Sequence, residues 1–259
     1  HKTEARNQYF LDLSRPEVAD YVYESVAKNL RSANIEYVKW DMNRTMTEIY
    51  SHGRSFKKQK ETVHRYFLGL YSILERLVNN FPNVLFESCA SGGNRFDAGM
   101  LHYMPQTWTS DDTVERLKIQ YGTSMVYPIP SMGSHVSITP NHQTKRITSL
   151  DMRGNVAIFG TFGYELNPKD LSEKDREDVK KQIRMFKQFR ELMAVGDFYK
   201  IKSPFDGTET AWAMISPDKK EALVGYYKVL VDVNGGFKRI KLFGLDKNLD
   251  YTVTKIGEK

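Results

Sequence analysis

Charged side chains stand at the end of a short apolar run, 37-YVKWDMNR-44. Successive side chains of a strand point to opposite faces, so Lys39 and Asp41 would share one face. A second carboxylate, Asp111, follows the strand-like run 105-PQTWTS-110. Carboxylates that come from the ends of two different strands are suited to general acid/base and nucleophilic chemistry on an uncharged substrate.

Strand-like and helical patterns alternate along most of the chain and would position these side chains. Strands are expected at 7–14, 35–41, 83–89, about 105–110, 125–129 and 155–162, and helices at 16–33, 56–81, about 113–122 and 172–195. Ser172 precedes several acidic residues, which is typical of a helix N-cap. The alternation indicates βα units and a parallel sheet covered by helices. The pattern alone fits either a doubly wound sheet or a (β/α) barrel.

The ends of the expected strands carry the polar residues. Asp41, Cys89 and Asp111 each close an apolar run and precede a turn. In a (β/α) barrel, the carboxyl ends of the strands carry the active site. The three side chains are therefore predicted to lie at one edge of the sheet.

The composition changes after about residue 200. Alternating runs at 210–216, 221–230, 237–243 and 250–256 are separated by turn residues, which is typical of a small antiparallel β module. We therefore predict a domain of βα units over residues 1–199 and a C-terminal antiparallel β domain over residues 200–259; the resemblance described below implies that the first is a partial catalytic barrel and the second is truncated.

Composition excludes several classes of protein. The chain has 259 residues, a net charge of +6 and one cysteine. No apolar run approaches the roughly 20 residues that span a bilayer, so no membrane partner is expected. The basic residues are spread among acidic ones without an aromatic-interleaved stripe, so no nucleic-acid partner is expected. The lone cysteine and the absence of a signal-like start predict a cytoplasmic location. The missing initiator methionine predicts a start inside a longer protein.

Several of these residues also have a purely structural interpretation. Cys89 alone is typical of a small buried hydrophobe. His135 and His142 lack a third ligand at a convincing spacing, so structural hydrogen bonds are expected and no metal. Arg95 and Asp97 are expected to form a supporting ion pair, and strand-end aspartates often cap helices or pair with arginine.

Longer motifs carry a resemblance to a known family. These are 36-EYVKWDMNR-44, 87-ESCASGGNRFDAGML-101, 105-PQTWTSDDTVERLKIQYGTSMVYP-128, 134-SHVSITPNHQT-144 and 160-GTFGYEL-166. In this order they resemble the α-galactosidases of glycoside hydrolase family 36. The resemblance implies a (β/α)8 TIM barrel, here without its first strands, followed by a small antiparallel β domain.

The resemblance also implies an activity and a set of site residues. The activity is retaining exo-hydrolysis of terminal α-linked galactose in melibiose and raffinose-type oligosaccharides, by double displacement and without a cofactor. Asp41 would be the nucleophile and Asp111 the acid/base. Further sugar-binding positions would be Arg6, Lys39, Asn43, Cys89 and Gly92, and Trp108 is either a sugar platform or a core residue.

Two alternatives to an autonomous hydrolase stay open. The chain could be an inactive or partner-dependent fragment with residual sugar binding. It could also transfer galactose to another sugar, as the related raffinose and stachyose synthases do. The resemblance further implies assembly into a homo-oligomer.

Overall fold

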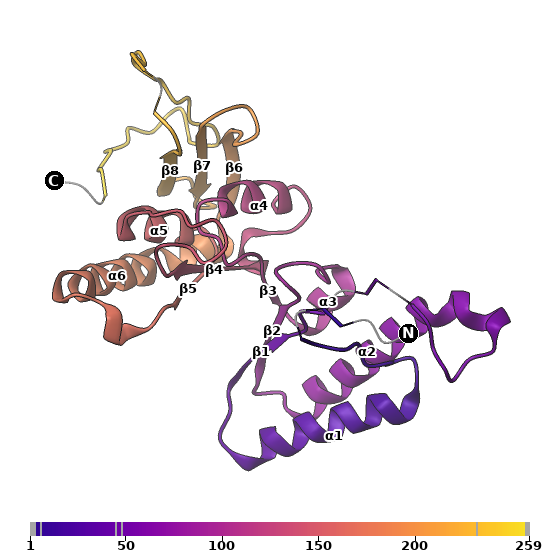
Figure 1. Cartoon of the computed structure of the whole chain (residues 1–259). Coiled ribbons are helices and arrows are strands. Elements are labelled where there is room, and N and C mark those ends of the chain that lie inside the picture. Colours follow the sequence, from indigo (N-terminus) through magenta and orange to yellow (C-terminus); the bar gives the residue numbers. More distant parts are fainter. Residues whose placement is uncertain (1–3, 6, 45, 48, 232, 257–259) are drawn as a thin grey trace. The chain divides into compact units, whose positions relative to one another are not determined.

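The chain forms two compact units, residues 1–108 and 109–259. The computed structural model describes residues 4–5, 7–44, 46–47, 49–231 and 233–256, and Figure 1 labels their helices and strands. No helix in these described ranges is long and apolar enough to cross a membrane.

The first unit is built from βα units. Its elements are α1 Pro16–Ser32, β1 Tyr37–Asp41, the 3-10 helix η1 Phe56–Glu61, α2 Thr62–Asn80, β2 Leu85–Cys89, α3 Ala98–Tyr103 and β3 Gln106–Trp108. Strands β1, β2 and β3 pair in parallel, with Asp41 opposite Cys89. The prediction of parallel strands that alternate with helices is thus confirmed for this unit.

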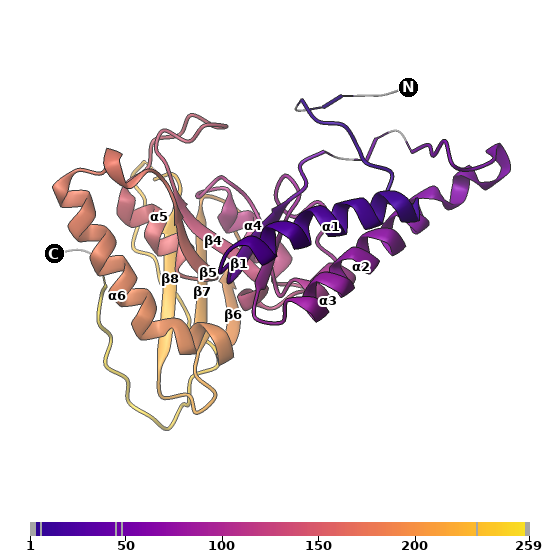
Figure 2. The same cartoon turned by 90° about the horizontal axis from the view of Figure 1, so that it is seen from below.

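The core of the first unit lies between its sheet and its two long helices. Helices α1 and α2 run side by side in Figures 1 and 2. The buried side chains of this core are Leu13, Ala19, Tyr23, Ala27, Leu30, Tyr66, Leu70, Ile73, Leu74, Leu77, Phe86, Met100 and Met104. Val38 and Trp40 pack against it. Because side chains alternate along β1, Lys39 and Asp41 are left on the opposite face.

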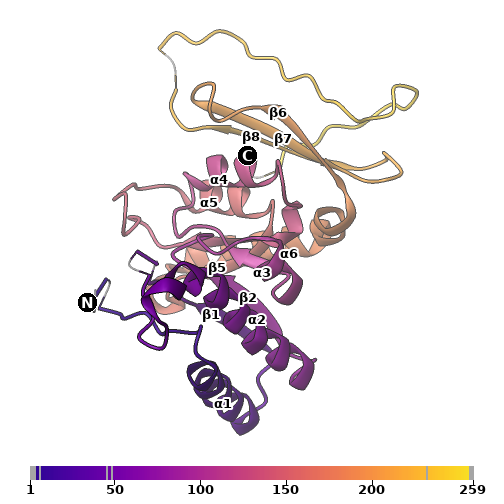
Figure 3. The same ribbon diagram turned by 90° about the vertical axis from the view of Figure 1, so that its right-hand side faces the viewer.

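The second unit combines a parallel strand pair with an antiparallel sheet. Its elements are α4 Arg116–Thr123, η2 Ile129–Ser131, β4 Met132–Ser137, α5 Leu150–Ala157, β5 Thr161–Glu165, η3 Pro168–Asp170, α6 Glu173–Val195, β6 Asp197–Lys202, β7 Glu209–Ile215 and β8 Ala222–Lys228. Strands β4 and β5 are parallel. Strands β6, β7 and β8 are antiparallel and lie next to one another in Figure 3.

The antiparallel sheet of the second unit shares its core with the helices. Trp212 on β7 is fully buried, and its ring meets those of Phe159 and Tyr227. Phe189 on α6 belongs to the same cluster. Helix α6 begins as predicted, because the Ser172 hydroxyl accepts a hydrogen bond from the amide of Asp175 at 3.1 Å.

Four strand predictions are wrong. Residues 7–14 form no strand. Asn7 has φ of 57°, and Ser14 donates its amide to the Asp12 carboxylate at 3.2 Å, so the local chain turns. The runs 125–129, 237–243 and 250–256 are not strands either. A strand needs a hydrogen-bonded neighbour, and the described residues pair none with these runs.

Three elements of the second unit differ from the sequence-based expectation. Residues 155–157 belong to helix α5, so the expected strand at 155–162 is reduced to β5, which starts at Thr161. Strand β4 was not expected, because half of its sequence MGSHVS is polar, although every one of its residues is buried. Strand β6 was not expected either, since it follows α6 after only one residue.

Candidate active site

The first group of candidate residues lies at the carboxyl ends of β1 and β2. Lys39 pairs with Glu87, and Asp41 with Cys89, across the two parallel strands. Residues that lie opposite one another in a sheet share a face, so these four side chains point to the same side. The predicted common edge is therefore observed for Asp41 and Cys89.

Asn43 holds the Asp41 carboxylate in place. Its side-chain amide donates to Asp41 Oδ2 at 2.5 Å, and its Oδ1 accepts the backbone amide of Ser91 at 2.9 Å. Ser91 and Gly92 have φ of 54° and 82°, so the chain after β2 turns sharply and aims a backbone N–H back at Asn43. The turn thereby orients the amide group toward the carboxylate.

Cys89 is a second neighbour of Asp41. Its side chain is buried and forms a hydrogen bond with the Asp41 carboxylate. Burial raises the pKa of this thiol to about 12, and the neighbouring Asp41 adds to the effect. The group is therefore a protonated thiol that donates to Asp41. The structural interpretation of Cys89 as a buried residue is confirmed, and its role as a sugar-binding residue stays a prediction.

Lys39 covers the ring of Trp108. The ammonium nitrogen lies 3.5 Å from the ring centroid, within the range of a cation–π contact. Trp108 is 9% exposed. In the described chain this face of the ring therefore packs under Lys39, and the interpretation of Trp108 as a core residue is favoured over that of an open platform.

A buried carboxylate, Glu87, supports this edge of the sheet. Glu87 is 3% exposed, and it accepts hydrogen bonds from Tyr37 and from the Gln106 amide at 2.7 Å. Buried charges require such partners. The sequence did not predict this role, although an acidic residue inside an apolar strand was a usable signal.

Arg95 and Asp97 do not form the predicted ion pair. Arg95 donates to the backbone carbonyls of Met42 and of Arg44, at 2.6 Å for the second. Asp97 caps α3, accepting the Met100 amide at 2.8 Å. The prediction is wrong because Arg95 donates to the loop after β1, whereas Asp97 caps the N-terminus of α3.

The second group surrounds Asp111, in the turn that follows β3. The Asp111 backbone carbonyl accepts from the Asn141 side-chain amide at 3.1 Å, and its carboxylate lies 3.6 Å from His142 Nε2. Asp112 is 4% exposed and accepts the Val114 amide at 3.3 Å. The turn is therefore held by the side chains of Asn141 and Asp112, which form hydrogen bonds with its backbone.

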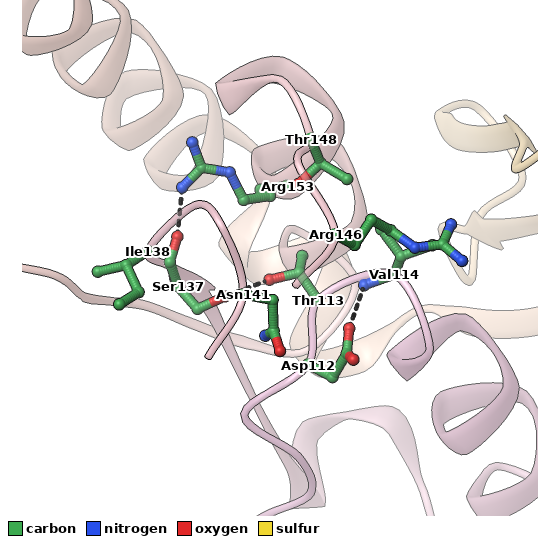
Figure 4. A pocket seen from close by; sticks show the side chains of 9 residues that line it. All are labelled: Asp112, Thr113, Val114, Ser137, Ile138, Asn141, Arg146, Thr148 and Arg153. Atoms are coloured by element: carbon green, nitrogen blue, oxygen red, sulfur yellow. Dashed lines mark hydrogen bonds between the residues drawn. The ribbon is translucent and has the colours of Figure 1, made fainter. Parts of the chain in front are cut away.

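A small polar cavity lies behind this turn (Figure 4). Its volume is about 10 Å³, room for about one water molecule. Asp112 Oδ2 is buried there without a hydrogen-bond partner among the described residues. Burial and the neighbouring Asp112 raise the pKa of Glu115. The cavity is too small for a sugar, so the residues that line it are part of the support of the turn.

His135, Arg116 and Glu165 form a third arrangement beside Asp111. Arg116 Nη2 lies 3.0 Å from His135 Nδ1, and His135 Nε2 lies 3.1 Å from a carboxylate oxygen of Glu165. One ligand atom each of Asp111, His135 and Glu165 lie within 4.8 Å of one another. The expectation that His135 has no third ligand nearby is therefore wrong, since the fold brings in Glu165 from β5.

Hydrogen bonding describes this trio better than metal coordination does. Guanidinium nitrogens can only donate, so Nδ1 of His135 accepts and the ring proton sits on Nε2. That N–H points at Glu165, which leaves no lone pair on Nε2 for an ion. Arg116 is fully buried, and burial lowers its pKa to about 10, so it still carries a positive charge at neutral pH.

The structure places the other predicted site residues as follows. Lys39, Asp41, Asn43, Cys89, Gly92 and Trp108 lie in the first unit, and Asp111 lies in the second. Arg6 lies outside the described residues. Glu87, Arg116 and Glu165 were not expected from the sequence as site residues.

Parallel βα units with carboxylates at the carboxyl ends of the strands are typical of (β/α)-barrel enzymes. A family profile described as Melibiase matches residues 1–196, and one described as the glycosyl hydrolase family 36 C-terminal domain matches residues 209–259. The chain therefore belongs to the Melibiase family, glycoside hydrolase family 36, as its motifs predict.

Characterised relatives agree with this assignment. Alpha-galactosidase AgaA from Geobacillus stearothermophilus is 52% identical over 99% of this chain and 35% of its own length. Alpha-galactosidase 1 from Pediococcus pentosaceus is 46% identical over 95% of this chain and 34% of its own length. The chain thus spans about a third of the length of these relatives.

Solved structures agree with the fold. The crystal structure of AgaA superposes with a TM-score of 0.91 at 53% identity, over 96% of this chain and 35% of AgaA. The alpha-galactosidase from Lactobacillus brevis gives 0.91 at 48% identity, over 95% of this chain and 34% of that structure. The predicted fold class, a (β/α) barrel followed by an antiparallel β domain, is confirmed, and the doubly wound alternative is excluded.

Proposed function

We propose that this chain carries the catalytic residues of a retaining α-galactosidase. Asp41 is the nucleophile and Asp111 the acid/base. The substrates are oligosaccharides with a terminal α-linked galactose. The observation that carries the proposal is the arrangement of Asp41, whose carboxylate receives the Asn43 amide and the Cys89 thiol at a strand end.

The relatives support this substrate class. Crystal structures of AgaA variants hold raffinose, stachyose or 1-deoxygalactonojirimycin. The variants in the raffinose and stachyose complexes each have one aspartate replaced, and the two positions are 70 residues apart. Asp41 and Asp111 have the same separation of 70 residues, which supports their assignment as a pair.

The proposed chemistry has two displacement steps. The Asp41 carboxylate attacks the anomeric carbon while Asp111 gives its proton to the glycosidic oxygen, which releases the aglycone. Asp111, now a carboxylate, takes a proton from water, and that water displaces Asp41 from the anomeric carbon. Two inversions give overall retention. A pair of this kind requires carboxyl groups roughly 5 Å apart.

The neighbours of Asp41 would bind the galactose hydroxyls. Lys39 and Asn43 supply donors on the same side of the sheet, and Cys89, Gly92 and Arg6 complete the proposed subsite. Trp108 would act mainly by holding Lys39 in place, because the ammonium lies over its ring. No step of the proposed mechanism uses a cofactor.

The other predictions remain proposals. These are the division at residues 199 and 200, a cytoplasmic location and assembly into a homo-oligomer. Because the chain spans about a third of its relatives, dependence on further segments is the alternative that a specific observation favours. Transfer of galactose to a second sugar would use the same covalent step with a sugar hydroxyl in place of water.

The test is hydrolysis of p-nitrophenyl α-D-galactopyranoside by the chain and by its Asp41→Ala and Asp111→Ala variants. An Asp250→Ala variant is the matched control, because Asp250 lies in the exposed C-terminal segment. Calorimetric titration with 1-deoxygalactonojirimycin reports binding without turnover. Activity that survives in Asp41→Ala would refute the assignment. Binding without turnover in the folded parent would identify a partner-dependent fragment.

A further inference from the structure

Glu165 is a carboxylate that the proposed mechanism does not use, although it stands beside Asp111. It is the last residue of β5, so it occupies the same position on its strand as Asp41 does on β1. Its side chain is 50% exposed. One of its carboxylate oxygens lies within 4.8 Å of a carboxylate oxygen of Asp111.

A buried histidine fixes the direction of this carboxylate. His135 on β4 is 1% exposed and pairs with Gly163 in the parallel ladder of β4 and β5. Its Nε2 lies 3.1 Å from Glu165 Oε2. Since the ring is enclosed, it cannot turn to follow a mobile partner, and Glu165 is held at one place along the strand edge.

Arg116 in turn fixes the proton of the imidazole. The guanidinium donates to the carbonyls of Ser110 at 2.7 Å and His135 at 2.5 Å, and to Nδ1 of the same ring at 3.0 Å. Because Nδ1 must accept, Nε2 carries the hydrogen and donates it to Glu165. Burial also keeps the imidazole neutral, lowering its pKa to about 4.

We propose that Glu165 is a substrate-contacting residue of the leaving-group subsite, which accepts hydrogen bonds from hydroxyls of a sugar aglycone. His135 and Arg116 are positioning residues for it. The inference rests on the proposed function, because the acid/base is by its role next to the glycosidic oxygen and hence next to the aglycone. A fixed, half-exposed carboxylate at that place selects substrates whose leaving group is itself a sugar.

The chemistry of the leaving group makes this role measurable. The Glu165 carboxylate lies against His135, and half of its side chain is exposed to solvent. A sugar aglycone presents hydroxyl donors to that open part, whereas a p-nitrophenyl aglycone presents none. A hydrogen bond to a charged acceptor changes affinity by about 10- to 100-fold. Loss of the carboxylate should therefore affect the two substrate types unequally.

The first experiment compares Glu165→Gln with the parent chain on melibiose and on p-nitrophenyl α-D-galactopyranoside. Glutamine keeps the shape and an oxygen that accepts from His135 Nε2–H, but it removes the charge. We expect kcat/KM for melibiose to fall about 10-fold or more, mainly through KM, and the value for the aryl substrate to change by less than about 3-fold. Glu191→Gln is the matched control, because Glu191 is an exposed residue of α6.

The second experiment measures the positioning residues without relying on turnover. In the Asp41→Ala background, ¹⁵N spectra of the imidazole rings should show His135 as the neutral Nε2–H tautomer. Saturating melibiose should shift its Nε2 signal, because the aglycone draws on the same carboxylate, and galactose alone should not. In the same background, Arg116→Met should broaden or mix the tautomers and remove the shift that melibiose causes.

The outcomes separate this inference from the proposed function. If the parent is active and Glu165→Gln lowers kcat/KM for both substrates equally, or for neither, the leaving-group role alone is overturned. An Nδ1–H tautomer in the parent overturns the positioning role of Arg116. A folded parent that neither hydrolyses nor binds α-galactosides overturns the proposed function and this inference with it.

Discussion

Arg116 and His135 form a buried cation–imidazole pair in which the guanidinium Nη2 lies 3.0 Å from the ring Nδ1. A second positive charge on the ring would face this guanidinium, so the pair is compatible only with neutral histidine. Burial is the larger cause and Arg116 the next unfavourable one, while Glu165 and Asp111 act in the opposite direction. The net result is that the His135 ring stays uncharged at pH values well below the ordinary pKa of histidine.

This pair predicts a loss of stability in mild acid. The pKa of His135 is about 4 in the folded chain against 6.5 for the unperturbed group, so the unfolded chain binds the extra proton first. The contribution of His135 is fully present above about pH 6.5, is lost as pH falls toward about 4, and is then constant; it amounts to about 3 kcal/mol. Urea unfolding at a series of pH values measures it.

Variants of two histidines isolate this contribution from the titration of other groups. His135→Gln should flatten the pH dependence of the unfolding free energy between pH 6.5 and 4. His142→Gln is the matched control, because its side chain is 54% exposed, and it should keep the wild-type slope. If both variants retain that slope, His135 is not the group responsible. Should His135→Gln not fold, NMR titration of the His135 ring in the parent gives its pKa directly.

The single thiol is predicted to be unreactive until the chain unfolds. Thiolate is the reacting form, and the pKa of Cys89 is raised from 9.0 to about 12, chiefly by burial. At pH 8 this lowers the thiolate fraction about 1000-fold relative to an ordinary cysteine. Iodoacetamide labelling followed by mass spectrometry should therefore track the unfolded fraction. Rapid alkylation under native conditions would contradict this environment.

Gly69 on α2 is predicted to be intolerant of any side chain. A Cβ there would lie 1.8 Å from the backbone oxygen of the buried Leu13, so backbone must move. We expect Gly69→Ala to destabilise by about 1–3 kcal/mol, although alanine has the better helix propensity. In Gly53→Ala, the matched control, the nearest atom is the flexible Arg15 Cδ at 3.5 Å. Thermal unfolding of both variants provides the measurement, and equal midpoints would refute the close approach.

The long elements of the fold could be predicted from the sequence because their apolar spacing is independent of the rest of the molecule. The predicted helices at 16–33 and 172–195 are α1 and α6 within one or two residues. Strand β4 could not be predicted in this way. Its serines and histidine are buried because Arg116 and Thr113, about 20 residues away, supply the hydrogen bonds. Helix α5 did have a local signal, since Ser149 caps it by accepting the Met152 amide.

The candidate site could likewise be predicted only in part from the sequence. Asp41 and Cys89 stand at the ends of two strongly apolar strands, so their common edge follows from the pattern alone. Glu165 ends a strand whose start was misplaced, and its significance depends on His135, 30 positions earlier. Contacts of this kind arise from the tertiary fold and leave no spacing in the sequence.

The assignment of nucleophile and acid/base predicts opposite stereochemistry in the two variants when azide is added. Asp41→Ala opens the face of the anomeric carbon opposite the leaving group, where a small anion can enter directly. Asp111→Ala keeps the nucleophile, so the galactosyl-enzyme still forms from an activated aryl substrate. In that variant, hydrolysis of melibiose should fall by about 10²- to 10⁴-fold, because its sugar leaving group needs the proton.

Azide should then give a different galactosyl azide from each variant. With Asp41→Ala, one displacement by azide gives the β-anomer. With Asp111→Ala, azide displaces Asp41 from the covalent intermediate, and two inversions give the α-anomer. Proton NMR of the anomeric signal distinguishes the products, and the parent chain with azide is the control. The α-anomer from Asp41→Ala would exchange the two roles, and the β-anomer from both variants would replace the double displacement by a single inverting step.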